Sequence, residues 1–213
     1  MTVRILCFGD SNVWGCIPNT RFKRFSEEVR FPKVLKKLLG SDFEVIEEGL
    51  NSRTLHSVYA RPNKEGRRGS DYFVPCLDSH DPLEWVILLL GTTELKEEFD
   101  NTPEEIGGLL ETYFVKVALT RKSQCGAKKR KVLIISPAVI DETTDYTKER
   151  YAGGTEKSKR LSAVYSKIAK KNKCGFVDAS GLKVGKDGVH LTKESHAKLA
   201  KLVANKIKPR QKR

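Results

Sequence analysis

Five short apolar runs recur along the chain, and longer amphipathic stretches separate them. These runs are rich in β-forming residues and predict strands at Val3–Phe8, Phe43–Glu47, Trp85–Leu90, Val132–Ser136 and Gly175–Asp178. The third and fourth runs are almost continuously apolar rather than alternating. This is typical of strands that are covered on both faces, as in a parallel sheet.

The stretches between these runs have helical patterns. Val34, Leu35, Leu38 and Leu39 fall on one face of a helix that Gly40 ends. Further helices are predicted from a cap at Thr102 to about Lys122, over Thr155–Lys171, and from a cap at Thr192. Most of the segment between the second and third strands has the composition of a polar loop.

Alternating strands and helices predict an α/β fold in a single domain, 1–213. Such a chain forms a three-layer α/β/α sandwich around about five parallel strands. Ligands bind outside the carboxyl ends of the strands in these folds. Two long polar loops, Asn12–Glu28 and Ser57–Ser70, are therefore expected at the rim of a site. Disorder or oligomer contacts are the alternatives for these loops.

Ser11 directly follows the first predicted strand, after Gly9 and Asp10. A glycine at the end of a strand permits a tight turn, which would project the serine hydroxyl from the sheet edge. Ser11 is thus a candidate nucleophile. The alternative is a helix or turn cap, which is a common role of serine.

Asp187 and His190 follow the fifth predicted strand, with only Gly188 and Val189 between them. The glycine lets the chain fold back, so that a carboxylate can reach the imidazole and orient it as a base. The alternative is an ordinary turn followed by a surface histidine. The carboxyl ends of parallel strands share one edge, so this pair could meet Ser11.

At this point the chain resembles the GDSL/SGNH hydrolases, and in particular their bacterial arylesterase/acyltransferase branch. Four ordered blocks carry the resemblance: Cys7–Gly15, Glu48–Thr54, Leu90–Glu94 and Asp187–His190. They are similar to the family's C-F-G-D-S-x-x-W-G, E-G-L-x-x-R-T, L-G-T-N-D and D-G-hydrophobic-H. The resemblance implies a flavodoxin-like strand order and hydrolysis or transfer of a small acyl group, with no metal or organic cofactor.

The resemblance also implies roles for individual residues. Ser11 would be the nucleophile, His190 its base and Asp187 the group that orients the base. Three donors would stabilise the oxyanion: the backbone N–H of Ser11, the backbone N–H of Ser52, and the side chain at position 93.

In the third block the chain departs from the family, because Thr93 replaces the asparagine. A threonine hydroxyl can donate one hydrogen bond, but it is shorter than the amide. Loss of one oxyanion donor costs roughly 10²–10³ in kcat. We expect Thr93 to be a weaker substitute donor; the alternative is a structural threonine with water in the gap.

Asp10, Trp14 and Asn51 are expected to contact the substrate. For Trp14 the alternative is a hydrophobic anchor, and for Asn51 and Ser52 it is the shaping of a turn. The other histidines, His56, His80 and His196, are interpreted as surface or polar-loop residues, so no metal site is predicted.

Lysine and arginine outnumber aspartate and glutamate by 40 to 27, which gives a net charge of +13. The basic clusters are Lys128–Lys131, Lys170–Lys173 and the tail Lys206–Arg213. They lie beside a predicted strand, at a helix end and at a terminus, without the aromatic residues that stack bases. A solvated basic surface is therefore favoured over nucleic-acid binding.

The remaining sequence features concern the protein's surroundings. Five widely spaced cysteines fit a reducing compartment better than a disulfide framework. No apolar run is long enough for a signal peptide or a membrane span, so we expect a cytoplasmic protein. The expected partners are a small-molecule ester and further copies of the chain. The competing hypotheses are an inactive member that binds an acylated or carbohydrate ligand, and a polyanion-binding protein.

Overall fold

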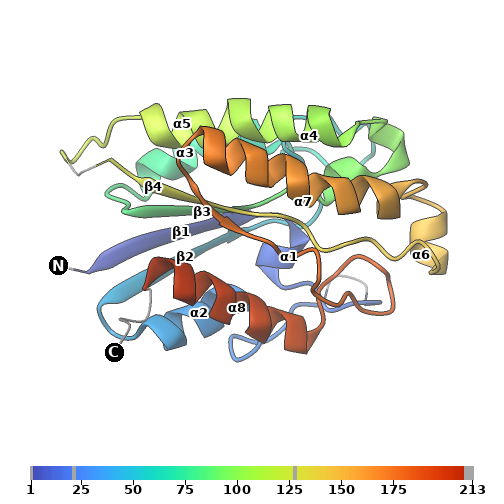
Figure 1. The fold of residues 1–213 in the computed structure, drawn as a ribbon, viewed down its shortest axis with the longest axis horizontal. Coiled ribbons are helices and arrows are strands. Elements are labelled where there is room, and N and C mark those ends of the chain that lie inside the picture. The colour runs from blue at the N-terminus through green and yellow to red at the C-terminus, as the bar shows by residue number, and fades with distance from the viewer. Residues whose placement is uncertain (1, 21–22, 127–128, 209–213) are drawn as a thin grey trace.

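The computed structural model describes residues 2–20, 23–126 and 129–208, and a parallel five-stranded sheet lies at its centre (Figure 1). The strands are β1 (Val3–Gly9), β2 (Phe43–Gly49), β3 (Trp85–Leu89), β4 (Lys131–Ile135) and β5 (Gly175–Val177). Their order in space, β2-β1-β3-β4-β5, is the expected flavodoxin-like order. Gly9 of β1 pairs with Gly49 of β2 and Leu89 of β3, so these three neighbouring strands end at one edge of the sheet.

Helices cover both faces of this sheet. The helices are α1 (Ser11–Trp14), α2 (Phe31–Leu39), α3 (Gly69–Ser79), α4 (Pro103–Leu110), α5 (Lys116–Thr120), α6 (Asp145–Lys148), α7 (Gly154–Lys171) and α8 (Lys193–Ile207). Helices α2 and α8 pack on one face, whereas α3, α4, α5 and α7 pack on the other (Figure 1). The predicted three-layer sandwich is confirmed.

The strand sequences explain this layering. Ile87 and Leu89 of β3 enter the core under α2 and α8, while Val86 and Leu88 enter the core under α3 and α7. Both faces of β3 are thus apolar, because successive side chains point to opposite sides of the sheet. This is why the run is continuous rather than alternating.

The predicted helix caps are confirmed. The Thr102 hydroxyl accepts from the Glu105 N–H at 3.2 Å, and the Glu105 carboxylate accepts from the Thr102 N–H at 2.8 Å, which completes a capping box. A π-helical turn, η3 (Glu111–Val115), links α4 to α5, so the helical path continues to Thr120. The Thr192 hydroxyl caps α8 by accepting from the Ser195 N–H at 3.2 Å.

One helix was missed and one prediction was wrong. The segment between β2 and β3 is mostly loop, as expected, but it also contains α3, which the polar composition and an internal Pro75 concealed. Its Phe73, Cys76 and Leu77 are buried at helical spacing. His196 is not on the surface of α8: it is fully buried, and its Nδ1 accepts from the Phe31 N–H of α2 at 3.2 Å.

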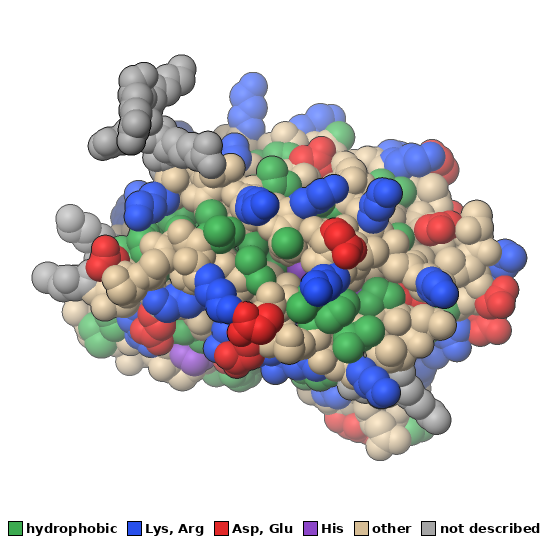
Figure 2. All heavy atoms as spheres, turned by 90° about the horizontal axis from the view of Figure 1, so that it is seen from below, with side chains coloured by type: hydrophobic (Ala, Val, Ile, Leu, Met, Phe, Trp, Pro, Cys, Tyr) green, Lys and Arg blue, Asp and Glu red, His purple; other side chains and the backbone are tan. Residues whose placement is uncertain are grey.

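The basic surface is dispersed over the layer formed by α2 and α8. Figure 2 shows lysine and arginine side chains spread over this face, interleaved with acidic and apolar ones. Within the described residues, no helix combines the length and the hydrophobicity that a membrane span requires. The predicted basic tail lies outside the described residues beyond Lys208.

Candidate active site

Ser11 is the first residue of α1, immediately past the end of β1. The carboxylate of Asp10 caps this helix by accepting from the Asn12 N–H at 2.9 Å. A Cβ on Gly9 would clash with the Val13 side chain and the Leu89 carbonyl oxygen. Glycine is therefore needed for the close return of α1 onto the sheet edge, and this return points Ser11 outward.

His190 lies in the loop between β5 and α8. Asp187 Oδ1 accepts from the N–H groups of Val189 and His190, at 3.1 and 2.9 Å. Gly188 adopts φ +72°, a left-handed conformation in which a side chain would be strained and would also meet the Asp141 carbonyl oxygen. The tight turn thus places the Asp187 carboxylate against the imidazole.

These two segments meet at one edge of the sheet. The Asn12 amide oxygen accepts from the Leu191 N–H at 2.9 Å, which ties the two loops together. His190 Nε2 lies 2.9 Å from Ser11 Oγ, and His190 Nδ1 lies 2.7 Å from Asp187 Oδ2. This hydrogen-bonded series of hydroxyl, imidazole and carboxylate can transfer a proton from the serine.

The Asp187–His190 pair is electrostatically coupled. Burial opposes ionisation of Asp187, but hydrogen bonds and the charge of His190 outweigh it and lower the pKa of Asp187 to about 2. Burial would likewise lower the pKa of His190, but Asp187 and the neighbouring Cys16 outweigh it and raise that pKa to about 10. The carboxylate therefore stabilises the imidazolium that proton transfer creates.

Ser11 opens into a pocket of about 520 Å³. Ser52 and Thr93 line the same pocket, so the three expected oxyanion donors come from loops after β1, β2 and β3. Thr93 begins the 3₁₀ turn η1 (Thr93–Leu95) and is almost fully buried. Ser52 has φ +61°, and its hydroxyl accepts from Lys64 Nζ at 2.9 Å.

Arg53 holds the loop that carries Ser52. Its Nη1 donates to the Gly9 carbonyl at 2.8 Å and also bonds the Glu48 carbonyl, while its guanidinium stacks 4.1 Å over the Phe8 ring centroid. This buried arginine therefore links the end of β2 to the end of β1. Five planar donors make arginine suited to such a link.

The three residues expected to contact substrate lie in different places. Asn51 lines the pocket beside Ser11. Asp10 is fully buried behind that pocket as the cap of α1, and burial raises its pKa. Trp14 lines a neighbouring pocket with Asn51, Lys64 and Arg67, and Arg24 stacks on its ring.

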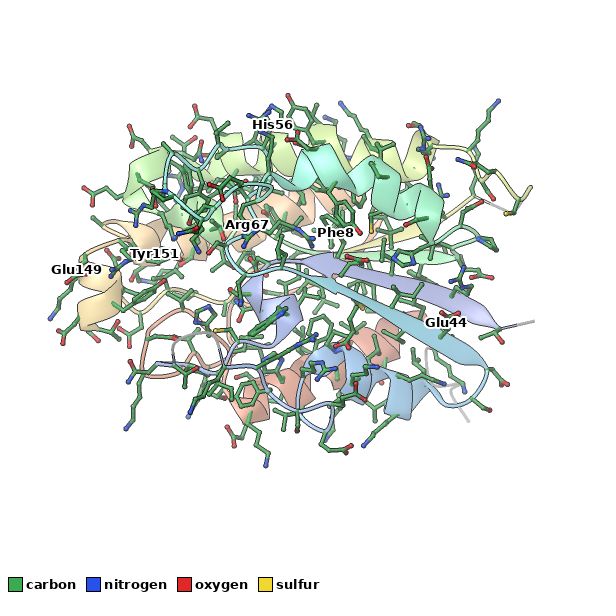
Figure 3. All side chains as sticks on the ribbon, turned by 180° about the vertical axis from the view of Figure 1, so that it is seen from behind. Phe8, Glu44, His56, Arg67, Glu149 and Tyr151 are labelled. Atoms are coloured by element: carbon green, nitrogen blue, oxygen red, sulfur yellow. The ribbon has the colours of Figure 1, made fainter. Side chains whose placement is uncertain are left out.

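Several pocket residues were not foreseen from the sequence. They are Cys16, Asn19, Thr20, Lys96, Tyr146, Arg150 and Tyr151. The first three lie in the loop predicted to form the rim, and the Asn19 N–H donates to Asp187 Oδ2 at 2.8 Å. The last three come from α6 and the residues after it; Figure 3 shows Tyr151 and Glu149 at the end of the molecule opposite Glu44. No motif marked them, because they follow β4 in a polar stretch without a recognisable pattern.

Glu48, Cys76 and His80 form a second polar cluster, between β2 and α3. Their potential ligand atoms lie within 4.8 Å of one another, which the sequence spacing did not reveal. Burial and the Glu48 charge raise the pKa of Cys76 to about 12, so this thiol stays protonated near neutral pH. His80 Nε2 and Glu48 Oε1 are 2.9 Å apart and form a hydrogen-bonded pair.

Comparisons with solved structures agree with the fold. No family profile and no curated protein sequence matches the chain. Among solved structures, the M. smegmatis aryl esterase is 34% identical over 97% of this chain and 98% of its own, with a TM-score of 0.87. A carbohydrate acetylesterase from Sinorhizobium meliloti is 33% identical over the same shares of the two chains, also with a TM-score of 0.87. A lipase/acylhydrolase from Enterococcus faecalis, 17% identical over 99% of this chain and 100% of its own at a TM-score of 0.67, shares the fold.

Proposed function

Because this chain belongs to the GDSL/SGNH hydrolase family, we propose that it is a carboxylic ester hydrolase with Ser11 as its nucleophile. One observation carries the proposal: Ser11 Oγ is 2.9 Å from His190 Nε2, and the other ring nitrogen is 2.7 Å from Asp187. Similarity to an aryl esterase and a carbohydrate acetylesterase supports the ester as substrate class.

The proposed reaction has two halves. His190 takes the Ser11 proton while Oγ bonds to the ester carbonyl carbon, and the tetrahedral intermediate then collapses to an acyl-enzyme. The C–O bond to the alcohol breaks, and His190 returns the proton to the departing oxygen. His190 then takes a proton from water, whose oxygen bonds to the acyl carbon. The bond between that carbon and Ser11 Oγ breaks, and His190 returns the proton to Oγ, which releases the acid and free Ser11.

A second alcohol in place of water would make the same enzyme an acyltransferase. The acyl-enzyme is common to both outcomes, so the proposal includes transfer as a competing route. Hydrolysis alone yields free acid, whereas transfer yields a new ester of the added alcohol. The ratio of the two products, measured with and without that alcohol, tests this part of the proposal.

The oxyanion in this scheme is held by the N–H groups of Ser11 and Ser52, with the Thr93 hydroxyl as third donor. All three residues line one pocket, which supports this assignment. Donors of this kind stabilise charge only as it develops in the transition state. They therefore raise kcat and do not change the affinity for the substrate.

The decisive test is covalent labelling by a fluorophosphonate, combined with a panel of esters of increasing acyl length. We expect labelling and turnover in the wild type, and a loss of both by roughly 10⁴-fold or more in Ser11→Ala. Ser26→Ala, at an exposed serine outside the pocket, is the matched control. Labelling that does not depend on Ser11 would favour the rival hypothesis, a binding protein for acylated ligands.

Two expectations about the protein's surroundings are retained as proposals. We propose a cytoplasmic location, in keeping with the free thiols of Cys7, Cys16, Cys76, Cys125 and Cys174. We also propose a homo-oligomer, for which light scattering coupled to size exclusion is the test. A mass of 24.0 kDa by that method would contradict it.

A further inference from the structure

The wall of the pocket beside Ser11 carries an ammonium group that the proposed hydrolysis does not use. We propose that Lys96 and Arg150 form an anion subsite, which selects esters carrying a carboxylate or phosphate away from the scissile bond. This inference rests on the proposed esterase function and adds a substrate class to it. The inference applies whether the acyl part or the alcohol part of the ester bears the charge.

Lys96 is held firmly in place next to the reaction centre. Its N–H donates to the Thr93 carbonyl at 3.2 Å, so it is fixed three residues from the expected oxyanion donor. Its side chain is buried, with 8% of the residue exposed, yet it lines the pocket together with Ser11. A lysine is seldom this buried without a pairing anion.

The structure joins Lys96 to Arg150 through the backbone. The N–H of Glu97, in the 3₁₀ turn η2 (Glu97–Phe99), donates to the Arg150 carbonyl at 3.0 Å. The two cations therefore sit on adjoining segments of one wall, and both line the pocket. An anion between them would meet a compact ammonium and a planar guanidinium, which is a common arrangement for oxyanion groups.

Negative charge at this wall is scarce. Among the described residues that line the pocket, Asp187 is the single carboxylate, and it is already paired with His190. Glu98 approaches Lys96 Nζ only to 3.9 Å, whereas it lies 3.0 Å from Arg61. Arg150 pairs with Glu149, whose side chain is 68% exposed and does not belong to the pocket lining.

The lowered pKa of Lys96 agrees with the scarcity of negative charge at this wall. Burial is the main cause that lowers the pKa of Lys96 to about 8, and the positive charges of Arg61, Lys64 and Arg150 act in the same direction. Glu98 opposes them without restoring the ordinary pKa. A bound anion would supply the missing countercharge and favour the ammonium form.

In the competing interpretation, Lys96 has a purely structural role and holds neighbouring residues together. Its Nζ bonds the Tyr59 hydroxyl and lies 4.9 Å from the Tyr59 ring centroid and 6.0 Å from that of Tyr151. Loss of such a structural contact would change the turnover of neutral and anionic esters by the same factor. Discrimination between the two ester types therefore separates the interpretations.

The experiment compares two aryl esters of similar acyl length, one ending in a methyl group and the other in a carboxylate. The readout is the ratio of kcat/KM for the anionic ester to that for the neutral ester. We expect Lys96→Met to lower this ratio about tenfold or more, since charged hydrogen bonds are worth factors of this size. Lys96→Arg should retain most of the ratio, and Arg150→Met should lower it less than Lys96→Met.

Lys201→Met, at an exposed lysine of α8, is the matched control and should leave the ratio unchanged. An equal loss for both esters in Lys96→Met, or an unchanged ratio, would overturn the proposal. Thermal unfolding of each variant identifies a failure to fold, in which case Arg150→Met decides the outcome by the same ratio.

A binding measurement keeps this inference separate from the esterase proposal. Calorimetry with Ser11→Ala uses glutarate, inorganic phosphate and uncharged glutaramide as three probes. Tighter binding of glutarate or phosphate than of glutaramide, lost in Ser11→Ala/Lys96→Met, supports the subsite even if no ester is turned over. The two anions show which oxyanion fits, and equal binding of all three probes would refute it.

Discussion

The buried carboxylate of Glu94 accepts a hydrogen bond from the backbone N–H of Leu55. This bond joins the segment after β3, which carries Thr93, to the loop after β2, which carries Ser52. Two of the expected oxyanion donors are therefore positioned by one fully buried acid. Burial is the main cause that raises the pKa of Glu94 to about 8, with the nearby Asp10 charge adding to it.

Glu94 should make the protein less stable as pH rises. Because the folded-state pKa lies above the unfolded value, the native state holds an extra proton between about pH 4.5 and pH 8. Stability from this group is thus present at low pH and lost as pH increases through this window. Glu94→Gln, which keeps an acceptor for Leu55, should remove this part of the pH dependence, on the order of a few kcal/mol.

Urea unfolding at pH 5.5 and pH 8.5 measures the effect in the wild type and the variant. Glu28→Gln, at an exposed carboxylate, is the control and should keep the wild-type slope. The idea fails if Glu94→Gln shows the same pH dependence as the wild type.

The raised pKa of His190 should appear in the pH–rate profile. A protonated imidazole cannot act as a base, so kcat/KM for a neutral ester should rise with pH, with its acidic limb above the ordinary histidine pKa of 6.5. Asp187→Asn removes the main hydrogen bond and charge that raise this pKa. The limb should then move to lower pH, while the rate falls by about 10⁴-fold because the imidazole loses its orientation.

Profiles from pH 5 to pH 10 on both proteins provide the measurement. A limb at the same pH in Asp187→Asn and wild type would mean that Asp187 does not set the pKa of His190.

Thr93 should contribute one hydrogen bond to the transition state. Thr93→Val keeps the shape of the side chain and removes the hydroxyl, so kcat should fall by roughly tenfold or more with little change in KM. Thr93→Asn supplies a longer amide donor from the same pocket wall and should raise kcat by a comparable factor. Both are assayed with a short-chain aryl ester, and a Thr93→Asn enzyme with no gain or a loss would contradict the role of a weaker substitute donor.

His196 should limit stability in acid. Burial is the main cause that lowers its pKa to about 4, so the folded state resists protonation that the unfolded state accepts below pH 6.5. Stability from neutral His196 is therefore present above pH 6.5 and lost as pH falls towards 4. His196→Asn keeps an acceptor for the Phe31 N–H and cannot titrate, so it should lose less stability between pH 7 and pH 4.5.

Thermal melts across this range compare His196→Asn with the wild type. His56→Asn, a partly exposed histidine hydrogen-bonded to Ser70, is the control. Parallel loss of melting temperature in His196→Asn and wild type would refute the prediction.

Much of this architecture was determined by the sequence alone, because it depends on short-range properties. The apolar run Trp85–Leu89 predicts a strand buried on both faces whatever surrounds it, and Thr102 with Glu105 caps a helix within four residues. The spacing of Asp187 and His190 around Gly188 likewise fixes their contact locally. Where local pattern is weak, prediction failed: α3 contains Pro75 and polar residues, and it is helical because Phe73 and Leu77 find a core.

Only the tertiary structure decided what surrounds Ser11. The order β2-β1-β3-β4-β5 brings loops that are far apart in sequence to one sheet edge, and no periodicity encodes which side chains then face the pocket. Lys96 appeared as one lysine among many, and His196 as a surface residue, until packing buried both. Burial and neighbouring charge are long-range properties, so they set the pKa values and the pocket lining that residue identity alone leaves open.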